Sequence, residues 1–381
     1  MEYLSAHETV SCWLRHGQGM VGIGSAYSQT FGNAAEVEDW WQDLTSQVEV
    51  DNECPDLPMS GPIAFISFPF AVQGSYEVIV PRVILGRSGG KSWVTTWNQE
   101  WIPQKQTIDS YTSSLTFCEG HTTRDQWIDA VNQAVTTINN HQIDKVVLAR
   151  DEVAALEVPI DLRHVLSRLS EAYPQTWTFC VKNLVGASPE LLIRQDRGLI
   201  TSRVLAGTIH GDHDPASLAE ALSSSSKDLA EHEFAVSSVA EALGPHCTSL
   251  HVPEMPFVLS LPNVMHLASD ISGAVRPGST VVGLASIIHP SAAVCGTPTQ
   301  EARHVIAELE HMDRGRYAGP VGWVNAHGDG EIALALRCGI FDGTHVRIFA
   351  GCGIVADSNP EAEWDETVAK LKPMKQALGV G

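Results

Sequence analysis

The chain has 381 residues, with 24 Lys+Arg against 45 Asp+Glu, and its net charge of −21 argues against nucleic acid or an anionic membrane surface as a partner. An apolar content of 44% with 18% charged residues is typical of a folded globular protein and excludes a disordered one. No apolar run approaches the roughly 20 residues of a membrane span, and the first residues do not resemble a secretory signal. The eight cysteines are scattered without a CxxC pair, so we expect reduced thiols in a cytoplasmic protein.

The first 115 residues are expected to be rich in β-strands. Three β-branched or aromatic runs, 62–70, 76–87 and 92–98, are separated by Gly/Ser turns. The acidic stretch 36–58, which contains several prolines, favours a short helix followed by a solvated loop.

Helices and strands then alternate along the chain. A helix is expected over 124–141, because Trp127, Val131, Val135 and Ile138 fall on one face. The pattern continues with strands at 144–153, 177–182, 189–195 and 198–209, and with helices at 161–173 and 226–243.

The C-terminal third predicts three strands, at 319–326, 331–341 and 345–353, joined by turns that contain Asp-Gly pairs. A last helix begins near Ser358, where the sequence Ser-Asn-Pro-Glu supplies an N-cap and a capping-box Glu361. The strands come in runs, and the helices do not follow a strict βαβ rhythm. We therefore predict an α+β fold with mostly antiparallel sheets.

Two motifs are weak evidence for a ligand site. The run from Gly17 to Gly22 matches GxGxxG, but a dinucleotide site needs a preceding strand and a following helix. Here a helix-like stretch precedes the motif and a strand-like one follows, which favours a Gly-rich turn. His210 and His213 lie in a stretch rich in Gly, Asp and Pro, and a solvated loop is favoured over a metal cluster.

Two helical stretches each carry a pair of carboxylates. Glu363 and Glu366 are three residues apart with Lys370 four residues later, so all three share one face. Asp228 and Glu231 repeat the spacing at the start of the helix predicted over 226–243. Two such pairs facing one another would offer the oxygen ligands that Mg²⁺ prefers. Spacing alone favours the alternative, two ordinary solvated acidic faces.

Three charged residues stand beside apolar segments. Arg337 interrupts the apolar strand predicted over 331–341, and an unpaired buried guanidinium costs several kcal/mol, so an anion must lie beside it. A structural carboxylate and a substrate carboxylate remain equal alternatives. Lys145 and Glu190 each stand at the edge of a strand-like run, where desolvation favours a neutral amine and raises the pKa of a glutamate. An acid–base pair needs both effects, although sequence alone favours surface placement.

Ten segments between residues 144 and 371 together resemble the chorismate-utilising enzymes, and within them most closely the isochorismate synthases. The segments are DKVVLAR, GASPELLIR, LAGT, SKDLAEHE, LPNVMHL, IIHPSAAVCGTP, AELEHMDRGRYAGPVGW, ALRC, FAGCGIV and AEWDETVAKL. No single segment is decisive, but ten in the same order are highly specific.

The resemblance implies an α+β fold in which a large, mostly antiparallel β-sandwich is flanked by helices. Residues 1–115 would form its β-rich N-terminal part and 116–381 its catalytic region, as one compact unit. The implied reaction is the Mg²⁺-dependent conversion of chorismate into isochorismate, feeding siderophore or menaquinone synthesis. The small-molecule substrate would then be the only obligate partner of a monomeric enzyme.

The resemblance also implies roles for individual residues. Lys145, as a neutral amine, would activate water to attack C2 of the ring, and Glu190 would protonate the departing C4 hydroxyl. His266 would lie near the ring hydroxyl. Glu231 and Glu366 would be the principal Mg²⁺ ligands, with Asp228 and Glu363 beside them. The remaining implied residues bind the substrate: Gly207, Thr208, Ala293, Arg337, Gly351 and Lys370.

The choice of reaction within this family depends on few positions. Ala206 replaces the lysine of aminodeoxychorismate synthases, and Ala293 resembles isochorismate synthases, whereas Tyr317 resembles the salicylate-type pattern. A salicylate synthase, which eliminates pyruvate, is therefore the first alternative. The second is an aminating synthase subunit that needs a glutaminase partner. A catalytically dead binding module is disfavoured, because the implied catalytic and metal residues are all retained.

Overall fold

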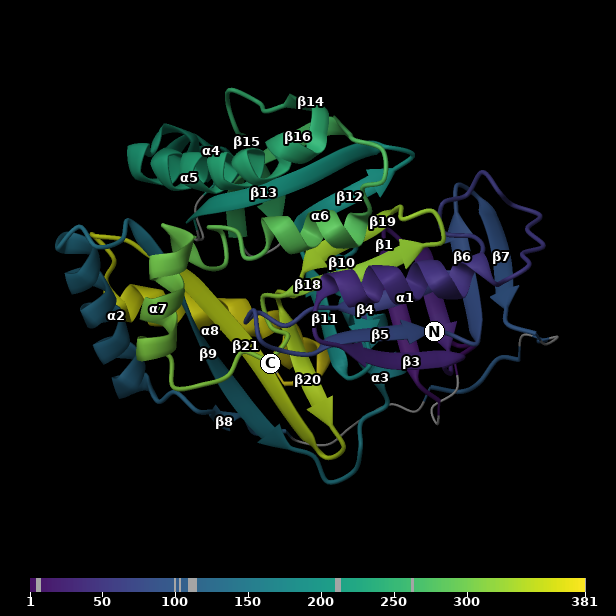
Figure 1. The fold of residues 1–381 in the computed structure, drawn as a ribbon. Coiled ribbons are helices and arrows are strands. Elements are labelled where there is room, and N and C mark those ends of the chain that lie inside the picture. Colours follow the sequence, from purple (N-terminus) through teal and green to yellow (C-terminus); the bar gives the residue numbers. More distant parts are fainter. Residues whose placement is uncertain are drawn as a thin grey trace.

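The computed structural model describes residues 1–4, 8–98, 101–102, 104–108, 115–209, 214–261 and 264–380. Two large antiparallel sheets dominate it (Figure 1). The first has the strand order β17 (Gly296–Thr297), β9 (Lys145–Ala155), β21 (His345–Ile354), β20 (Cys338–Asp342), β11 (Leu184–Ser188), β10 (Trp177–Val181), β1 (Val10–Arg15), β2 (Gln18–Ile23), β6 (Val83–Ser88) and β7 (Lys91–Thr96), with β8 (Cys118–Glu119) also paired to β9.

The second sheet has the order β14 (Cys247–His251), β16 (Val264–Val275), β13 (Leu199–Ile209), β12 (Leu191–Asp196), β19 (Gly330–Leu334), β18 (Pro320–Asn325), β4 (Ile63–Ser67), β5 (Tyr76–Val80) and β3 (Tyr27–Phe31), with β15 (Phe257–Leu261) also paired to β16. One buried cluster contains side chains from both sheets, among them Trp13 and Phe179 of the first and Phe65 and Val321 of the second. The predicted α+β fold with antiparallel sheets in a sandwich is therefore confirmed.

Eight α-helices flank the sheets in the described part of the chain: α1 (Ala34–Ser46), α2 (Arg124–Asn139), α3 (Leu162–Ala172), α4 (Pro215–Ser224), α5 (Ser226–Leu243), α6 (Val281–Ile288), α7 (Thr299–Leu309) and α8 (Pro360–Ala377). In Figure 1, α4 and α5 lie beside β13 at the top, whereas α2, α7 and α8 lie beside β9 and β21 on the left. No helix in the described part is long and apolar enough to cross a membrane.

Most predicted elements are present close to their expected bounds, including the helices at 124–141, 161–173 and 226–243. The eight cysteines are free thiols. The elements that were not predicted include β11, α4, β14, β15, β16, α6 and α7. The helix-like stretch before Gly17 is in fact strand β1, and His16 and Gly17, both with positive φ, form the two-residue turn of a β1–β2 hairpin. His210 and His213 lie outside the described residues.

Two predicted strands are each divided between the two sheets. The run 76–87 breaks at Pro81, which has no N–H to donate to a ladder, so β5 enters the second sheet and β6 the first. The run 331–341 breaks at residues 335–337, which carry the chain from β19 to β20. Arg337 therefore lies in this crossover and not in a central strand.

The start of the last helix also differs from the prediction. Asn359 is the N-cap of α8, and its side chain accepts hydrogen bonds from the backbone N–H groups of Glu361 and Ala362. Pro360 takes the first helical position, where its missing N–H costs nothing. Ser358 instead donates from its hydroxyl to Glu363 at 2.7 Å.

Candidate active site

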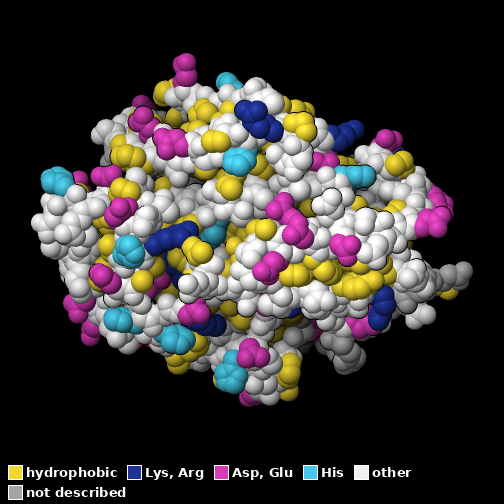
Figure 2. Space-filling view, viewed as in Figure 1, with side chains coloured by type: hydrophobic (Ala, Val, Ile, Leu, Met, Phe, Trp, Pro, Cys, Tyr) yellow, Lys and Arg dark blue, Asp and Glu magenta, His cyan; other side chains and the backbone are white. Residues whose placement is uncertain are grey.

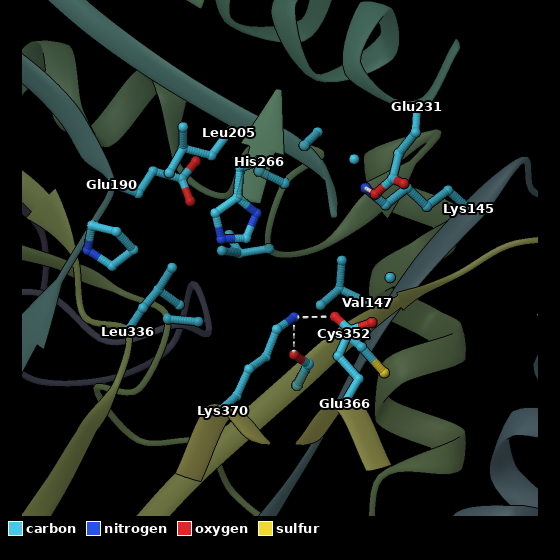
Figure 3. Close-up of a pocket in the computed structure, with 18 of the residues that line it drawn as sticks. Lys145, Val147, Glu190, Leu205, Glu231, His266, Leu336, Cys352, Glu366 and Lys370 are labelled. Carbon is cyan, nitrogen blue, oxygen red and sulfur yellow. Dashed lines mark hydrogen bonds and ion pairs between the residues drawn. The ribbon is translucent and has the colours of Figure 1, made fainter. Parts of the chain in front are cut away.

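One cavity collects nearly all of the residues singled out from the sequence (Figure 3). Its walls come from β9, β13, β16, β21, α5 and α8 and from the crossover at 335–337. The predicted residues that line it are Lys145, Glu190, Gly207, Asp228, Glu231, His266, Ala293, Arg337, Gly351, Glu363, Glu366 and Lys370. Thr208 follows Gly207 in β13, and its side chain lies outside the described part of the structure.

Lys145 is the first residue of β9, and its side chain is buried and paired. Its Nζ donates to Oε1 of Glu231 on α5 at 2.6 Å. Burial acts to raise the pKa of Glu231, but the charge and hydrogen bond of Lys145 outweigh it and the pKa is lowered. Gly353 of β21 makes room for this pair, because a Cβ there would lie 2.7 Å from Cε of Lys145.

A second lysine–glutamate pair lies on α8. Lys370 Nζ is 2.5 Å from Oε1 of Glu366, one helical turn away, and donates to the carbonyl of Gly351 at 3.0 Å. Glu363 lies on the same face, and its pKa is raised, chiefly by burial. The predicted shared face of α8 is thus turned toward the cavity.

The second acidic pair reaches the cavity because α5 approaches β13 closely. Gly207 has φ 78°, and a Cβ on it would lie 3.0 Å from Cβ of Asp228. Ser225 caps α5 by accepting a hydrogen bond from the Asp228 backbone N–H at 3.3 Å. A larger residue than glycine at 207 would separate the acidic end of α5 from the strand.

Glu190 lies across the cavity from the Lys145–Glu231 pair, with His266 between them (Figure 3). Glu190 is only 6% exposed. Burial raises its pKa from 4.5 to about 8, against a backbone hydrogen bond from Leu205 and the charges of Lys145, Arg337 and Lys370. A carboxyl with this pKa is protonated at neutral pH and can donate a proton.

Arg337 reaches the cavity from the crossover between the two sheets. Its φ of 48° is in the left-handed region, which costs a non-glycine residue roughly 1–2 kcal/mol. Its guanidinium makes no ion pair with a carboxylate in the described part of the chain. Of the two anions considered from sequence, the structural carboxylate is therefore not observed, and the guanidinium is available to a ligand.

The sequence interpretation missed a buried ion pair in the same wall. Arg314 lines the cavity, and its Nε donates to Oε2 of Glu310 at 2.8 Å. The four-residue spacing of Glu310 and Arg314 is visible in the sequence, but both residues lie beyond the last residue of α7, so the helical spacing rule does not identify the pair. The role of Gly353, by contrast, depends on residues far away in the sequence and left no local signal.

The chemistry of the four carboxylates fits a hard divalent cation, although the structure does not gather them around one point. Asp228, Glu231, Glu363 and Glu366 offer only oxygen ligands, as Mg²⁺ prefers. Among the described residues, no group of three acidic, histidine or cysteine side chains is close enough to hold a metal ion. Glu231 and Glu366 instead each bind a lysine.

The cavity gathers four cationic side chains within an acidic protein. Asp and Glu side chains are spread over the face shown in Figure 2, in keeping with the net charge of −21. Lys145, Arg314, Arg337 and Lys370 all line the cavity. Five carboxylic side chains line it as well, and three of the four cations pair with a glutamate, so Arg337 is the cation most available to a small anion.

A family model described as chorismate binding enzyme matches residues 13–379. The chain is 33% identical to isochorismate synthase EntC of Escherichia coli K12, over 87% of this chain and 89% of that protein. It is 38% identical to isochorismate synthase MenF of Bacillus subtilis 168, over 67% of this chain but only 56% of that longer protein. The solved structure of DhbC from Bacillus anthracis superposes with a TM-score of 0.82 and 29% identity, covering 99% of this chain and 98% of that one.

Proposed function

Because the chain belongs to the chorismate-binding enzyme family, we propose that it is an isochorismate synthase, which converts chorismate into isochorismate with Mg²⁺. The observation that carries this proposal is the pair of buried groups on opposite sides of one cavity. Glu190 is protonated at neutral pH, whereas Lys145 lies at the far wall. The curated relatives named above share this activity by name.

The two buried groups divide the proton transfers between them. Lys145 takes a proton from the water that attacks C2 of the ring, and Glu190 gives a proton to the hydroxyl that leaves C4. Because Lys145 Nζ donates to Glu231 at 2.6 Å, the amine must leave that carboxylate before it can act as a base. The enzyme thereby contributes positioning and matched proton transfers.

The other residues bind and orient the substrate. Arg337 and Lys370, together with the backbone near Gly207, Thr208 and Gly351, hold its carboxylates. His266 lies near the ring hydroxyl, and Ala293 leaves space beside the ring. Glu231 and Glu366, with Asp228 and Glu363, would hold Mg²⁺, which when bound supplies positive charge for an anionic group of the substrate.

The N-terminal part belongs to the same folded unit in this proposal. Both sheets contain strands from residues 1–115 and from 116–381, which supports one compact unit. Since water is the nucleophile, no ammonia-supplying partner is required. The product feeds siderophore or menaquinone synthesis, which share this chemistry.

A salicylate synthase is the second candidate, and Tyr317 favours it. This residue lines the cavity, and its ring stacks on Phe349 with centroids 5.1 Å apart. The hydroxyl of Tyr317 at this wall is the feature that resembles the salicylate-type pattern. The two candidates share the first reaction and differ in whether pyruvate is then eliminated.

A product assay distinguishes these functions. Chorismate is incubated with and without Mg²⁺, and the products are separated by chromatography at short and long times. Isochorismate that appears only with Mg²⁺ and reaches equilibrium with chorismate supports the synthase. Salicylate with pyruvate supports the second candidate, and a product that forms only with ammonium supports an aminating enzyme.

A further inference from the structure

We propose that Lys145 and Lys370 are built-in counter-cations of the metal-binding carboxylates, which a divalent cation must displace in order to bind. The inference deepens the proposed function, because it rests on the assignment of Glu231 and Glu366 as Mg²⁺ ligands. It concerns the free enzyme, before chorismate enters the cavity.

The first observation is that both principal carboxylates already bind a cation. Lys145 Nζ lies 2.6 Å from Glu231, and Lys370 Nζ lies 2.5 Å from Glu366. The lysine side chains are 4% and 12% exposed, and those of the glutamates 18% and 21%. Pairs at this depth are only weakly screened by solvent, so they are not ordinary surface salt bridges.

The second observation is that β21 holds both lysines in these positions. Gly353 leaves the space that Lys145 occupies beside Glu231. The carbonyl of Gly351, two residues earlier, accepts a hydrogen bond from Lys370. One strand therefore favours both pairs over arrangements in which the lysines point elsewhere.

The third observation explains why the lysines are needed and why no ligand cluster forms. Glu231 and Glu366 line the same cavity, and their like charges repel one another. Each lysine neutralises one of them, and no three acidic, histidine or cysteine side chains among the described residues are gathered at one point. A divalent cation can replace both lysines at once, since it carries the same total charge as the two ammonium groups.

This exchange couples metal binding to the state of the site. Displacement of Lys145 frees the amine that the reaction needs as a base, and displacement of Lys370 frees a cation for a substrate carboxylate. The metal and the substrate therefore increase each other's affinity, as linkage requires. Without substrate, competition from the lysines keeps the affinity for Mg²⁺ low.

The test is a calorimetric titration of the full-length protein with MgCl₂ alone, at pH 8 and without chorismate. Lys145→Met and Lys370→Met keep side chains of similar length but remove the competing charge. Each should bind Mg²⁺ about tenfold more tightly than the wild type, as expected when a competing, partly buried ion pair is removed. Lys375→Met is the matched control, because Lys375 lies on the same helix and pairs with Glu152 at 2.5 Å, outside the cavity.

Lys145→Arg tests whether the charge or the size of the side chain is responsible. It retains a competing cation, so it should not bind Mg²⁺ more tightly than the wild type. Circular dichroism and thermal unfolding verify that each variant is folded, and Lys370→Met carries the test alone if Lys145→Met is not. Unchanged or weaker affinity in the folded Met variants would overturn the inference, as would equal tightening in Lys145→Arg. Because no chorismate is present, the two tests are independent. The titration can contradict this inference while the product assay shows isochorismate, and the titration can support it while no isochorismate forms.

Discussion

Two regions at the cavity each contain a buried glutamate and an arginine. In the first region the two side chains form an ion pair, and in the second they do not. In the first region, Arg314 donates to Glu310 and to the carbonyls of Val294 and Val147 at 3.0 and 2.7 Å, and Glu310 accepts from the Ala149 N–H at 2.7 Å. In the second, Glu190 and Arg337 line the same cavity, and neither forms an ion pair with another side chain in the described part of the structure. Residue type alone does not separate the two regions.

This difference shows which charged groups stabilise the fold and which are available to a ligand. Burial acts to lower the pKa of Arg314, but Glu310 outweighs it and the pKa is raised. Arg314 in turn acts to lower the pKa of Glu310, although burial still raises it overall. Their hydrogen bonds connect β9 to the segment at 294, and the guanidinium lies 4.0 Å over the ring of Phe70. Glu190 and Arg337, in contrast, retain the capacity to bind and protonate a ligand.

The largest expected effect is on folding, in the region of Arg314 and Glu310. Arg314→Met leaves the carboxylate of Glu310 buried without its partner, and the free energy of unfolding should fall by about 3–5 kcal/mol. Chemical denaturation measures the loss. The exposed pair between Arg124 and Glu361 supplies the control, since Arg124→Met should cost less than about 1 kcal/mol. Equal stability of the Arg314 variant and the wild type would remove the distinction between the two regions.

In the region of Glu190 and Arg337, the largest effect should be on catalysis. Glu190→Gln keeps the shape of the side chain but cannot supply the proton, so kcat should fall by about 10²–10⁴-fold. The thermal unfolding temperature should not decrease, because the neutral amide replaces a carboxyl that is already protonated in the folded protein at neutral pH. Isochorismate formation and chorismate binding are both measured. A variant that keeps most of its kcat would exclude Glu190 as the general acid.

Arg337→Met should weaken chorismate binding by roughly 10–100-fold, the usual loss for one hydrogen bond to a charged group. The free energy of unfolding should be unchanged or increased, since no carboxylate among the described residues loses an ion-pair partner and the variant removes a desolvated charge. Equilibrium binding and thermal unfolding of the same preparations verify both statements. A large loss of stability in Arg337→Met would place this residue with Arg314 and not with the ligand-binding groups.

The sequence predicted the parts of this site that depend on local spacing. The acidic pairs on α5 and α8 follow from residues three and four apart, and the helix predicted over 226–243 coincides with α5. Lys145 and Glu190 were identified at the edges of apolar runs, but the surface placement that sequence alone favoured is wrong, because the structure buries both. These features are local, because a helical period or a strand edge is fixed within a few residues.

The missed features depend on contacts between distant residues. Apart from Glu331 and Arg337 the run 331–341 is apolar, because most residues of β19 and β20 are buried, so its pattern does not show that the chain crosses between sheets at Arg337. Gly353 matters through Lys145 and Glu231, which are more than a hundred residues earlier in the chain. Burial distinguishes Glu310 and Arg314 from a surface pair at the same spacing, and burial is a property of the whole fold.

The pH dependence of folding tests the protonation of Glu190 without substrate. Between pH 4.5 and about 8 the folded protein holds a proton on Glu190 that the unfolded chain releases. The free energy of unfolding therefore falls as the pH rises through this range, by at most about 1.4 kcal/mol per pH unit from this group. Chemical denaturation from pH 5 to 8 should show a shallower decline for Glu190→Gln than for the wild type, since the other titrating groups are common to both. Parallel curves would mean that Glu190 is ionised in the folded protein, and it could not then act as the proton donor at neutral pH.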